Sequence, residues 1–590
     1  MGTLSDRIEQ LRKKMKKTGV DAYYIPTSDF HGSEYVNDYF KVREFFSGFT
    51  GSAGELLVTG KEALLWTDGR YFIQAEKELE GSGIKLMKSG MDGVPSVEQY
   101  LKGLPEKSVL GFDGRTVSAH LGKKLKKCIP SHTVKYRADL SEGIFERPPF
   151  PKGGIRVLPD ELSGDSSIDR IARIRESLKE KKLDALFISK LDEIAYLFNI
   201  RSDDIRYTPV AMAYAYITRE KAYIFLNDEK ADTGYPASLV KDYREVNAFL
   251  KGSAVSGRVM ADLSSVSYLH YRLLKKRAKI TDAQSPVVMM KAVKNPVEIS
   301  HIKEIYHKDS LQLTRFIRWI TSTDSRETEM SAADKLLEYR KGTKEFNDLS
   351  FETISAYADN AAIIHYAPSA EHDKEIEKRG MLMVDSGGQY DGGTTDVTRT
   401  IVMGELTDEE RRDFTEVACG MLRVMNAVFP KGTTGHALDV LAREKMWKRG
   451  VDYRHGTGHG VGYMLSVHEG PQSIRSRSLG KEEPLVPGML VSDEPGIYRE
   501  GKYGIRTENI LLVEEDSRTD DGQFYRFFSI TQVPIDDKGM DRRLMTAEET
   551  AMYESYQKDV YESLAPELSD DERKWLSEYA GLSKKEEAEG

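Results

Sequence analysis

Residues 381–402 read MLMVDSGGQYDGGTTDVTRTIV, and this stretch decides the fold of the last third of the chain. Two apolar runs, 381–386 and 394–402, flank a glycine-rich segment. Apolar runs of this length that are separated by Gly and Asp predict two strands joined by a turn. Asp385 lies in the first predicted strand and Asp396 lies in the second. A hairpin would bring both carboxylates to one end of a sheet.

The same arrangement returns at 489–513. Residues 489–494 read MLVSDE, a glycine-containing turn follows at 501–504, and residues 505–513 read IRTENILLV. The pattern predicts a second hairpin that carries Glu494 on one strand and Glu508 on the other. His459 lies between the two predicted hairpins, in the stretch HGTGHG.

These five residues have the donor atoms of a metal site. An unpaired charge inside an apolar strand is costly, so the carboxylates need a shared partner. Four carboxylates and one imidazole suffice for two divalent metals, which can activate water at neutral pH. The sequence therefore predicts a metal-dependent hydrolase. Two alternatives stay open: aspartates near turns are more often solvated or capping residues, and Arg399 or Arg506 would also neutralise a carboxylate.

Three further histidines lie near the predicted ligands in sequence. The segment between His455 and His459 reads Gly-Thr-Gly, which has little helix propensity and excludes a helical H-E-x-x-H zinc site. His365 lies in AAIIHYAPS and His468 in VHEGP. A lone histidine in an apolar segment is more often a core residue. Close to carboxylate ligands, it is instead placed to donate to a carbonyl oxygen as charge develops there.

The first half of the chain contains a repeat. Apolar residues at helical spacing, with Ser5 as the expected N-cap and Gly19 as the end, precede a strand at 20–25. The same order returns further along the chain, with a helix before a strand at 183–188. The matched apolar positions are Ile8, Leu11 and Met15 in the first copy, and Ile171, Ile174 and Leu178 in the second. Alternating helices and strands predict two related α/β domains.

Proline and glycine mark the expected domain boundaries. Residues 148–154 read PPFPKGG, and a second break near 285–296 ends in a strong helix start with Asn295 as N-cap. We therefore expect domains at 1–150, 151–290 and 291–590. Possible capping boxes at Thr546 and Ser569 predict terminal helices whose aromatic residues pack on the catalytic domain or on a partner subunit.

Composition narrows the class of protein. At 590 residues the chain is too long for one core, and its net charge of −9 argues against a nucleic-acid binder. No apolar run approaches a membrane span, and the first residues lack the apolar core of a signal peptide. The two cysteines, Cys128 and Cys419, are expected to be buried thiols in a reducing compartment. The expected location is the cytoplasm.

Six stretches together resemble aminopeptidase P (Xaa-Pro aminopeptidase), a family of "pita-bread" metallopeptidases, in its long three-domain cytosolic form. They read HYAP, DSGGQYDGGTTDVTRT, HGTGHGVG, VHEGP, SDEPG and GIRTEN. Residues 45–71 and 191–201 are similar to that family's first and second domains. The resemblance implies an α/β chain in which two related N-terminal domains precede a C-terminal pita-bread catalytic domain.

The resemblance also implies roles for single residues. The five ligands of a dinuclear site, usually manganese, match Asp385, Asp396, His459, Glu494 and Glu508. Asp396 and Glu508 match the bridging carboxylates, and Glu494 matches the residue that shuttles a proton. The histidines that position substrate and stabilise the intermediate match His365, His455 and His468. Arg506 is expected to reach the peptide beyond the proline, unless it pairs with a carboxylate.

The implied reaction is hydrolysis of the first peptide bond of short peptides whose second residue is proline, by a hydroxide that two metals activate. Alternatives are prolidase, which cleaves only dipeptides, a creatinase-like amidinohydrolase, and a binding protein without metals. A homodimer is implied, with no nucleic-acid or membrane partner. Ser202, Ile497 and Thr507 depart from the family's usual residues, so we expect them to affect substrate preference and leave metal binding unchanged.

Overall fold

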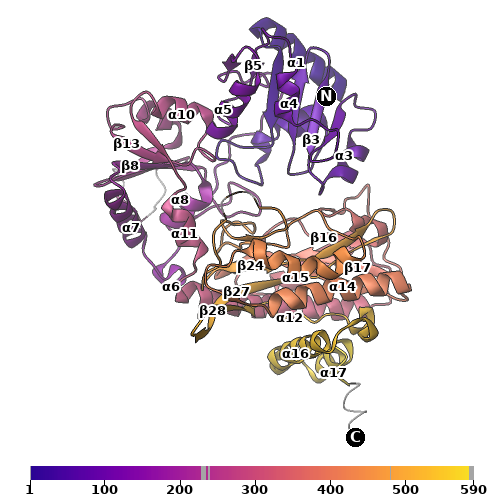
Figure 1. The fold of residues 1–590 in the computed structure, drawn as a ribbon. Helices are drawn as coiled ribbons and strands as arrows, with labels where there is room; N and C mark the ends of the chain where they lie inside the picture. Colours follow the sequence, from indigo (N-terminus) through magenta and orange to yellow (C-terminus); the bar gives the residue numbers. More distant parts are fainter. Residues whose placement is uncertain (1, 228–233, 237–238, 479, 481, 584–590) are drawn as a thin grey trace. The chain divides into compact units, whose positions relative to one another are not determined.

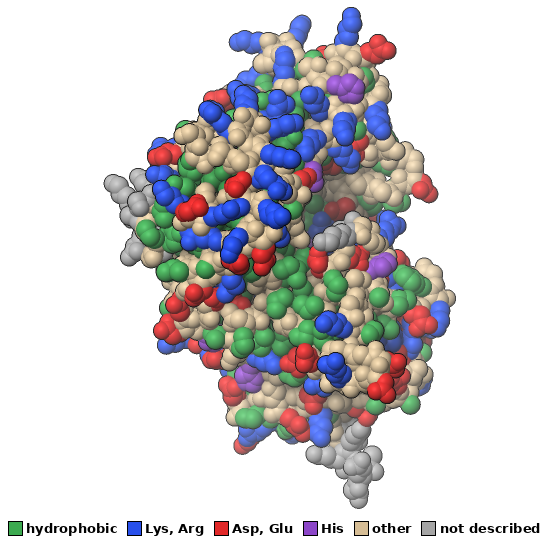
Figure 2. All heavy atoms as spheres, turned by 60° about the vertical axis from the view of Figure 1, so that its left-hand side comes forward, with side chains coloured by type: hydrophobic (Ala, Val, Ile, Leu, Met, Phe, Trp, Pro, Cys, Tyr) green, Lys and Arg blue, Asp and Glu red, His purple; other side chains and the backbone are tan. Residues whose placement is uncertain are grey.

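The computed structural model describes residues 2–227, 234–236, 239–478, 480 and 482–583. These residues form two compact units, Met1–Val288 and Met289–Gly590 (Figure 1). Within the described part of the chain, no helix has both the length and the apolar character that a membrane span requires. On the face that Figure 2 shows, Lys and Arg side chains gather in the upper part of the view.

The first unit contains two six-stranded sheets with the same topology. One has the order β4(Lys85–Lys88), β3(Ala63–Thr67), β2(Glu55–Thr59), β1(Ala22–Pro26), β5(Leu110–Gly111), β6(Val134–Lys135). The other has the order β12(Val240–Asp242), β11(Ala222–Leu226), β10(Ala213–Thr218), β8(Ala185–Ile188), β13(Arg258–Ala261), β14(Lys279–Asp282). Corresponding strands pair in the same direction in both sheets. The predicted repeat is therefore confirmed.

Each copy opens with an amphipathic helix, α1(Leu4–Thr18) or α7(Ser167–Glu180). All six apolar positions that the sequence analysis matched between the copies are buried. The expected cap at Ser5 is wrong. The N-cap of α1 is Thr3, because its hydroxyl accepts from the Asp6 N–H while the Asp6 carboxylate accepts from the Thr3 N–H.

The two helices end alike. The Val20 N–H donates to the Met15 carbonyl in the first copy, and the Leu183 N–H donates to the Leu178 carbonyl in the second. The residue before each of these donors is left-handed, with φ 60° at Gly19 and φ 54° at Lys182. The same chain reversal is therefore made by a glycine in one copy and by a lysine in the other.

The second unit opens with α12(Pro296–Ser322), and the capping box predicted at Asn295 is confirmed. One sheet has the order β16(Ile354–Tyr357), β17(Met381–Ser386), β20(Val397–Val402), and another has the order β21(Val428–Pro430), β28(Gly522–Ser529), β27(Asn509–Thr519), β24(Leu490–Asp493). Alternate residues of β17 face opposite sides: Leu382 packs with α12, and Met381 packs with α14(Asp408–Met425). Helices therefore cover both faces of this sheet, as Figure 1 shows.

Two predicted strands are interrupted where the chain changes sheets. The predicted strand 394–402 consists of β19(Gly393–Thr394), which pairs with β18(Gly388–Tyr390), and the separate β20. The predicted strand 505–513 is split between β26(Tyr503–Arg506), which pairs with β25(Gly496–Arg499), and β27. Asp396 and Glu508 lie at these two breaks and are not inside strands. The predicted antiparallel pairing of each hairpin is confirmed, β17 with β20 and β24 with β27, whereas the placement of Asp396 and Glu508 inside continuous strands was wrong.

The terminal helices are α16(Ala547–Leu564) and α17(Asp570–Tyr579), and both begin with the predicted capping boxes. Tyr553 and Tyr556 are buried in a core that they share with α14, and Tyr579 is buried against α12. These helices therefore pack on the second unit, as one of the two expectations proposed. Both cysteines are buried and free, as expected.

Candidate metal centre

The four predicted carboxylates meet where strands of two sheets of the second unit end, the sheet of β17 and β20 and the sheet of β24 and β27. Asp385 lies in β17 opposite Thr398, and Asp396 comes directly before β20. Glu494 follows β24 directly, and Glu508 precedes β27 directly. The Glu508 N–H donates to the Thr398 carbonyl at 3.0 Å, which ties the two sheets together at this point.

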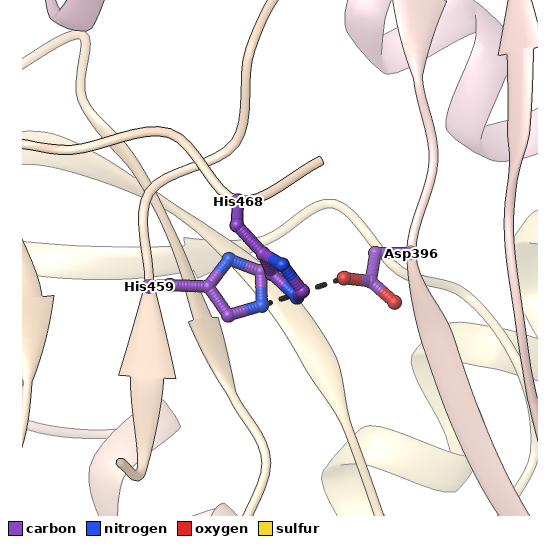
Figure 3. A group of neighbouring side chains, drawn as sticks. All are labelled: Asp396, His459 and His468. Carbon is purple, nitrogen blue, oxygen red and sulfur yellow. Dashed lines mark ion pairs between the residues drawn. The ribbon is translucent and has the colours of Figure 1, made fainter. Parts of the chain in front are cut away.

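His459 reaches the carboxylates from β22(Gly458–His459). Its Nε2 lies 3.5 Å from Asp396 Oδ2 and 3.5 Å from Glu494 Oε1. Figure 3 shows the His468 ring beside it, and the two rings meet edge to face with centroids 4.4 Å apart. Only glycine fits at position 458, because a Cβ there would lie 1.8 Å from the Ser492 carbonyl oxygen.

The ligand atoms form one continuous cluster. They make up three groups, and within each group all ligand atoms lie within 4.8 Å of one another. The groups are Asp396, His459 and His468; His459, Glu494 and Glu508; and Asp385, Asp396 and Glu508. Since neighbouring groups share members, all five predicted ligands and His468 belong to the same centre.

Two buried carboxylates of the cluster each have one oxygen bonded and one oxygen open. Asp385 Oδ2 pairs with Arg506 Nη2 at 2.6 Å, and Glu508 Oε2 accepts from the Thr398 hydroxyl at 2.9 Å. The other oxygens, Asp385 Oδ1 and Glu508 Oε1, are buried without a hydrogen-bond partner among the described residues. A buried acceptor without a partner is costly, and a cation between the two would satisfy both. Carboxylate oxygens with one imidazole suit divalent ions such as Mn²⁺, so the donor set fits.

Burial and mutual repulsion disfavour the charged carboxylates. Burial raises the pKa of Asp396 well above its usual value, and Asp385 adds to the effect. Burial likewise raises the pKa of Glu508, with Asp396 as the next cause. Burial raises the pKa of Glu494 to about 7, although Arg506 opposes the shift. The site therefore binds positive charge, and protons and metal ions compete for it.

Arg506 is the cation that the structure places against the cluster. Its guanidinium is buried and donates to Asp385 Oδ2, to the Tyr498 hydroxyl at 2.7 Å and to the Ile364 carbonyl at 3.3 Å. The ion pair foreseen as an alternative for Arg506 thus exists, with Asp385 as the partner. Arg399 does not neutralise a ligand, because it donates to the backbone carbonyl of Glu508.

The remaining predicted histidines lie at different depths in the site. His455 Nε2 is 2.8 Å from the Tyr498 hydroxyl, and Nδ1 is 4.0 Å from Glu494 Oε2. His365 is half-buried and belongs to none of the three groups. The residue before it, Ile364, accepts from Arg506, so this part of the chain also reaches the cluster.

Two contributors to the site were absent from the sequence analysis. Tyr498 links His455 to Arg506, and Thr398 fixes one oxygen of Glu508. The sequence did contain a signal for Thr398: it lies two residues after Asp396, so both side chains point to the same side of an extended chain. Tyr498 had no comparable signal, because a tyrosine in a short strand is ordinary.

Comparisons with known proteins cover nearly the whole chain. The model described as "Metallopeptidase family M24" matches residues 300–515, and the "C-terminal region of peptidase_M24" matches residues 523–580. Two models described as "Creatinase/Prolidase N-terminal domain" match residues 7–141 and 146–298. The order of these matches is the order of the two repeated sheets and the second unit.

Individual relatives agree. A "Probable Xaa-Pro aminopeptidase P" of Talaromyces marneffei is 37% identical over 594 residues, which cover 96% of this chain and 90% of the relative. One of Tuber melanosporum, with the same description, is 38% identical and covers 95% of both chains. The crystal structure of an X-prolyl aminopeptidase from Caenorhabditis elegans, described as a cytosolic enzyme with a di-nuclear active site, is 32% identical, with a TM-score of 0.92 over 98% of this chain and 100% of that one.

These matches confirm the predicted architecture of two related N-terminal α/β domains followed by a pita-bread domain. The sequence motifs, the fold and the clustered ligands point to the same family. The chain therefore belongs to metallopeptidase family M24 and, within it, to the Xaa-Pro aminopeptidase P family of enzymes.

Proposed function

We propose that this enzyme releases the first residue of short peptides whose second residue is proline, with two divalent ions, Mn²⁺ first among the candidates, in the cluster. The observation that carries the proposal is the pair of buried oxygens, Asp385 Oδ1 and Glu508 Oε1, that have no hydrogen-bond partner in the part of the chain that the structure describes and lie within one cluster of donors. The descriptions of the relatives supply the substrate class, since they are Xaa-Pro and X-prolyl aminopeptidases.

The ions would be held by Asp385, Asp396, His459, Glu494 and Glu508. We assign Asp396 and Glu508 as the shared ligands, because they are the two carboxylates that belong to two of the three groups of donors, and a carboxylate has two oxygens to share. Two ions bound there would supply Lewis acidity and a hydroxide at neutral pH.

Glu494 is the proposed proton carrier. Its side chain is 19% exposed, against 11% for Asp385 and 5% for Asp396, so it is the most accessible of these three carboxylates to an incoming peptide. In the proposed reaction one Glu494 oxygen takes the proton of the attacking water. The same oxygen then returns that proton to the proline nitrogen as the leaving group departs.

Three histidines and Arg506 would hold the substrate. His468 lies against His459, so its ring is placed to donate to the carbonyl oxygen as charge develops there. We assign His365 to the same oxygen or the peptide beside it, and His455 to the side of the proline ring. Arg506 would reach the peptide beyond the proline only on the side that it shares with Tyr498, since its other nitrogens bond to Asp385.

The proline distinguishes the bond that is cleaved from other peptide bonds. The bond before proline is a tertiary amide, so it offers no N–H, and it has a cis/trans equilibrium. A site can select such a bond by shape. Ile497 and Thr507, which depart from the family pattern, are both 1% exposed, so we propose that they act on substrate preference only through packing. Ser202 is proposed to act on preference as well.

We further propose domain boundaries at 1–150, 151–290 and 291–590, a homodimer, and a cytoplasmic location. The family matches at 7–141 and 146–298 support the first boundary, and the cytosolic relative supports the location. The dimer rests on the family resemblance alone. Light scattering tests it, with an expected mass of twice 66.7 kDa.

The test separates aminopeptidase P from prolidase. An Xaa-Pro-Yaa tripeptide and the matching Xaa-Pro dipeptide are incubated with enzyme that has been chelated and then reloaded with Mn²⁺. Release of the first residue from the tripeptide only, lost on chelation and restored by Mn²⁺, is expected. Preference for the dipeptide would make the enzyme a prolidase. No cleavage of either peptide by metal-loaded protein would reject the proposal.

A matched pair of variants ties the activity to the cluster. Glu508→Gln replaces a buried proposed ligand, whereas Glu514→Gln removes a half-buried carboxylate of β27 that pairs with Lys303 of α12. We expect Glu508→Gln to lose bound metal, measured by mass spectrometry of the metals, and to lose nearly all activity. Glu514→Gln should keep both.

A further inference from the structure

Glu469, the residue after His468, forms buried ion pairs with two lysines, Lys291 and Lys294. Lys291 Nζ is 3.0 Å from Glu469 Oε2, and Lys294 Nζ is 3.4 Å from Glu469 Oε1. None of the three residues is more than 4% exposed. Removing such charges from water costs several kcal/mol per ion unless the geometry is well fixed. The Lys294 ammonium is fixed further, because it donates to the Lys291 carbonyl at 2.8 Å.

The chain around Glu469 is folded tightly onto the segment that carries His459. The Glu469 N–H donates to the Gly460 carbonyl at 2.7 Å. A Cβ at Gly460 would lie 2.0 Å from the Glu469 carbonyl oxygen, and a Cβ at Gly462 would lie 2.7 Å from Glu469 Oε2. Both glycines are therefore required by the backbone and carboxylate of Glu469. Glu469 thus holds the chain next to His468 against the chain next to His459, and the two ion pairs tie Glu469 itself to Lys291 and Lys294.

These contacts bear on how the imidazole rings of His459 and His468 lie relative to each other. His459 belongs to the ligand cluster, and the His468 ring meets it at an interplanar angle of 88° (Figure 3). Glu469 is the next residue after His468, so the direction of its side chain and that of the imidazole are set by the same short stretch of backbone. A shift of the carboxylate would therefore shift the ring.

We infer that Glu469, clamped by Lys291 and Lys294, is a positioning residue that fixes the His468 ring at the metal centre. The inference rests on the proposed function, in which His468 donates to the substrate carbonyl. Glu469 touches neither the substrate nor a ligand in this role and acts through His468. Its effect should therefore fall on turnover and leave the binding of metal and of substrate largely unchanged.

A double-mutant cycle tests this dependence. Glu469→Gln keeps the shape of the side chain and removes its charge, and we expect kcat to fall about 10-fold or more, since displacement by about 1 Å can cost 10²-fold. KM and metal content should change by less than about twofold. In a His468→Ala background the same substitution should change kcat by less than about twofold, because the coupled partner is gone.

The chain offers a matched control. Glu549 is also a buried carboxylate paired with two cations, Arg423 and Lys445, but it caps α16. Glu549→Gln should lower Tm and leave kcat unchanged. A purely structural role for Glu469 would give this same result, and such an outcome would overturn the inference. An equal loss of kcat from Glu469→Gln with and without His468 would overturn it as well.

A second measurement is independent of activity. In protein labelled with ¹³C-histidine, the signal that disappears in His468→Ala identifies His468 among the 12 histidines. Glu469→Gln should move this signal, and Glu549→Gln should leave it in place. An unmoved signal contradicts the inference even if no Xaa-Pro peptide is cleaved. If Glu469→Gln does not fold, Lys291→Met, which leaves Lys294 on the carboxylate, is read in the same two assays.

Discussion

At the scale of the residue, two of the proposed ligands, Asp385 and Glu508, are each held by one oxygen, and the other oxygen is left to the cluster. Arg506 fixes Asp385 Oδ2, and Thr398 fixes Glu508 Oε2. Bonds of this kind orient a ligand before any ion arrives, and they also determine how basic the ligand is. The energetic consequence is largest for Asp385, since its partner is itself buried and charged.

We predict that Arg506→Met destabilises the chelated protein by about 3–5 kcal/mol, because it leaves a buried carboxylate without its cation. Urea unfolding in the presence of EDTA measures the change in the free energy of unfolding. Arg526→Met is the control, since this arginine is 52% exposed and should alter that free energy by less than about 0.5 kcal/mol. A loss below about 1 kcal/mol for Arg506→Met would mean that Asp385 is not held by this pair.

The convergence of the five proposed ligands was predictable from sequence, and so was a carboxylate partner for Arg506, whereas the roles of Thr398 and Tyr498 were missed. Asp385 is recognisable in the sequence, because burying an unpaired carboxylate in an apolar run costs free energy and therefore requires a partner. Thr398 and Tyr498 carry no such cost, since hydroxyl and aromatic residues are common in strands. Their partners, Glu508 and His455, lie far from them in the chain, so the alternation of Thr398 with Asp396 could indicate the side to which Thr398 points but not its partner.

At the scale of the element, features that depend on residues close in sequence were predicted correctly. The positions at which the chain passes from one sheet to another were missed. The capping boxes at Asn295, Thr546 and Ser569 each involve a cap and its third following residue, so the sequence contains the whole interaction. The breaks at Asp396 and Glu508 occur because the two parts of each predicted strand pair in different sheets. In the second break, the Glu508 N–H bonds to Thr398 in the other sheet. A strand pattern alone does not say which sheet a residue joins.

The repeated helix ends give a prediction at this scale. A left-handed lysine costs about 1–2 kcal/mol, whereas glycine adopts this conformation freely but loses more entropy on folding. We therefore expect Lys182→Gly to stabilise the first unit by about 0.5–1 kcal/mol, measured by denaturant unfolding.

The neighbour Lys181 supplies the control, because its φ of −80° is available to any residue. Lys181→Gly should leave stability unchanged or lower it, since only the entropic cost of glycine remains. In the first copy, Gly19→Ala should destabilise, because φ is 60° there. Equal effects of Lys181→Gly and Lys182→Gly would show that the left-handed backbone is not the cause.

At the scale of the whole molecule, the repeat could be predicted and the catalytic fold could not be predicted from pattern alone. A helix followed by a strand, found once before residue 26 and again at 171–188, predicted two related domains, and the identical strand orders confirm them. In each copy most pairings join strands of the sheet that follow one another in the chain, and the exceptions are β1 with β5 and β8 with β13. The second unit also pairs strands far apart in the chain, such as β21 with β28. Only the resemblance to a known family supplied that arrangement.

One buried acid makes the stability of the molecule depend on pH. Burial raises the pKa of Asp536 to about 6, against the Val402 and Lys538 N–H groups, which lower it. The folded pKa lies above the unfolded value, so protonation favours the fold. This stabilisation is fully present below the unfolded pKa and is lost as pH rises through about 6.

We expect the unfolding free energy of the parent protein, relative to Asp536→Asn, to increase by about 1.4 kcal/mol between pH 7 and pH 5. The amide does not titrate, and every other group is common to both proteins, so the difference isolates Asp536. Unfolding is followed by fluorescence at each pH. If the unfolding free energy of the parent relative to the variant stays constant, or if it decreases on acidification, then Asp536 is ionised in the folded state throughout this range.

The last prediction concerns metal removal. An ion that binds the folded state at about 100 times its dissociation constant stabilises it by about 2.7 kcal/mol. All five proposed ligands belong to the second unit, and none belongs to Met1–Val288. We therefore expect two calorimetric transitions, of which chelation lowers only the one that belongs to Met289–Gly590, and Mn²⁺ restores it. Glu508→Gln assigns that transition, because its Tm should no longer respond to Mn²⁺. A shift of both transitions by equal amounts would mean that the ions stabilise more than the unit that contains the cluster.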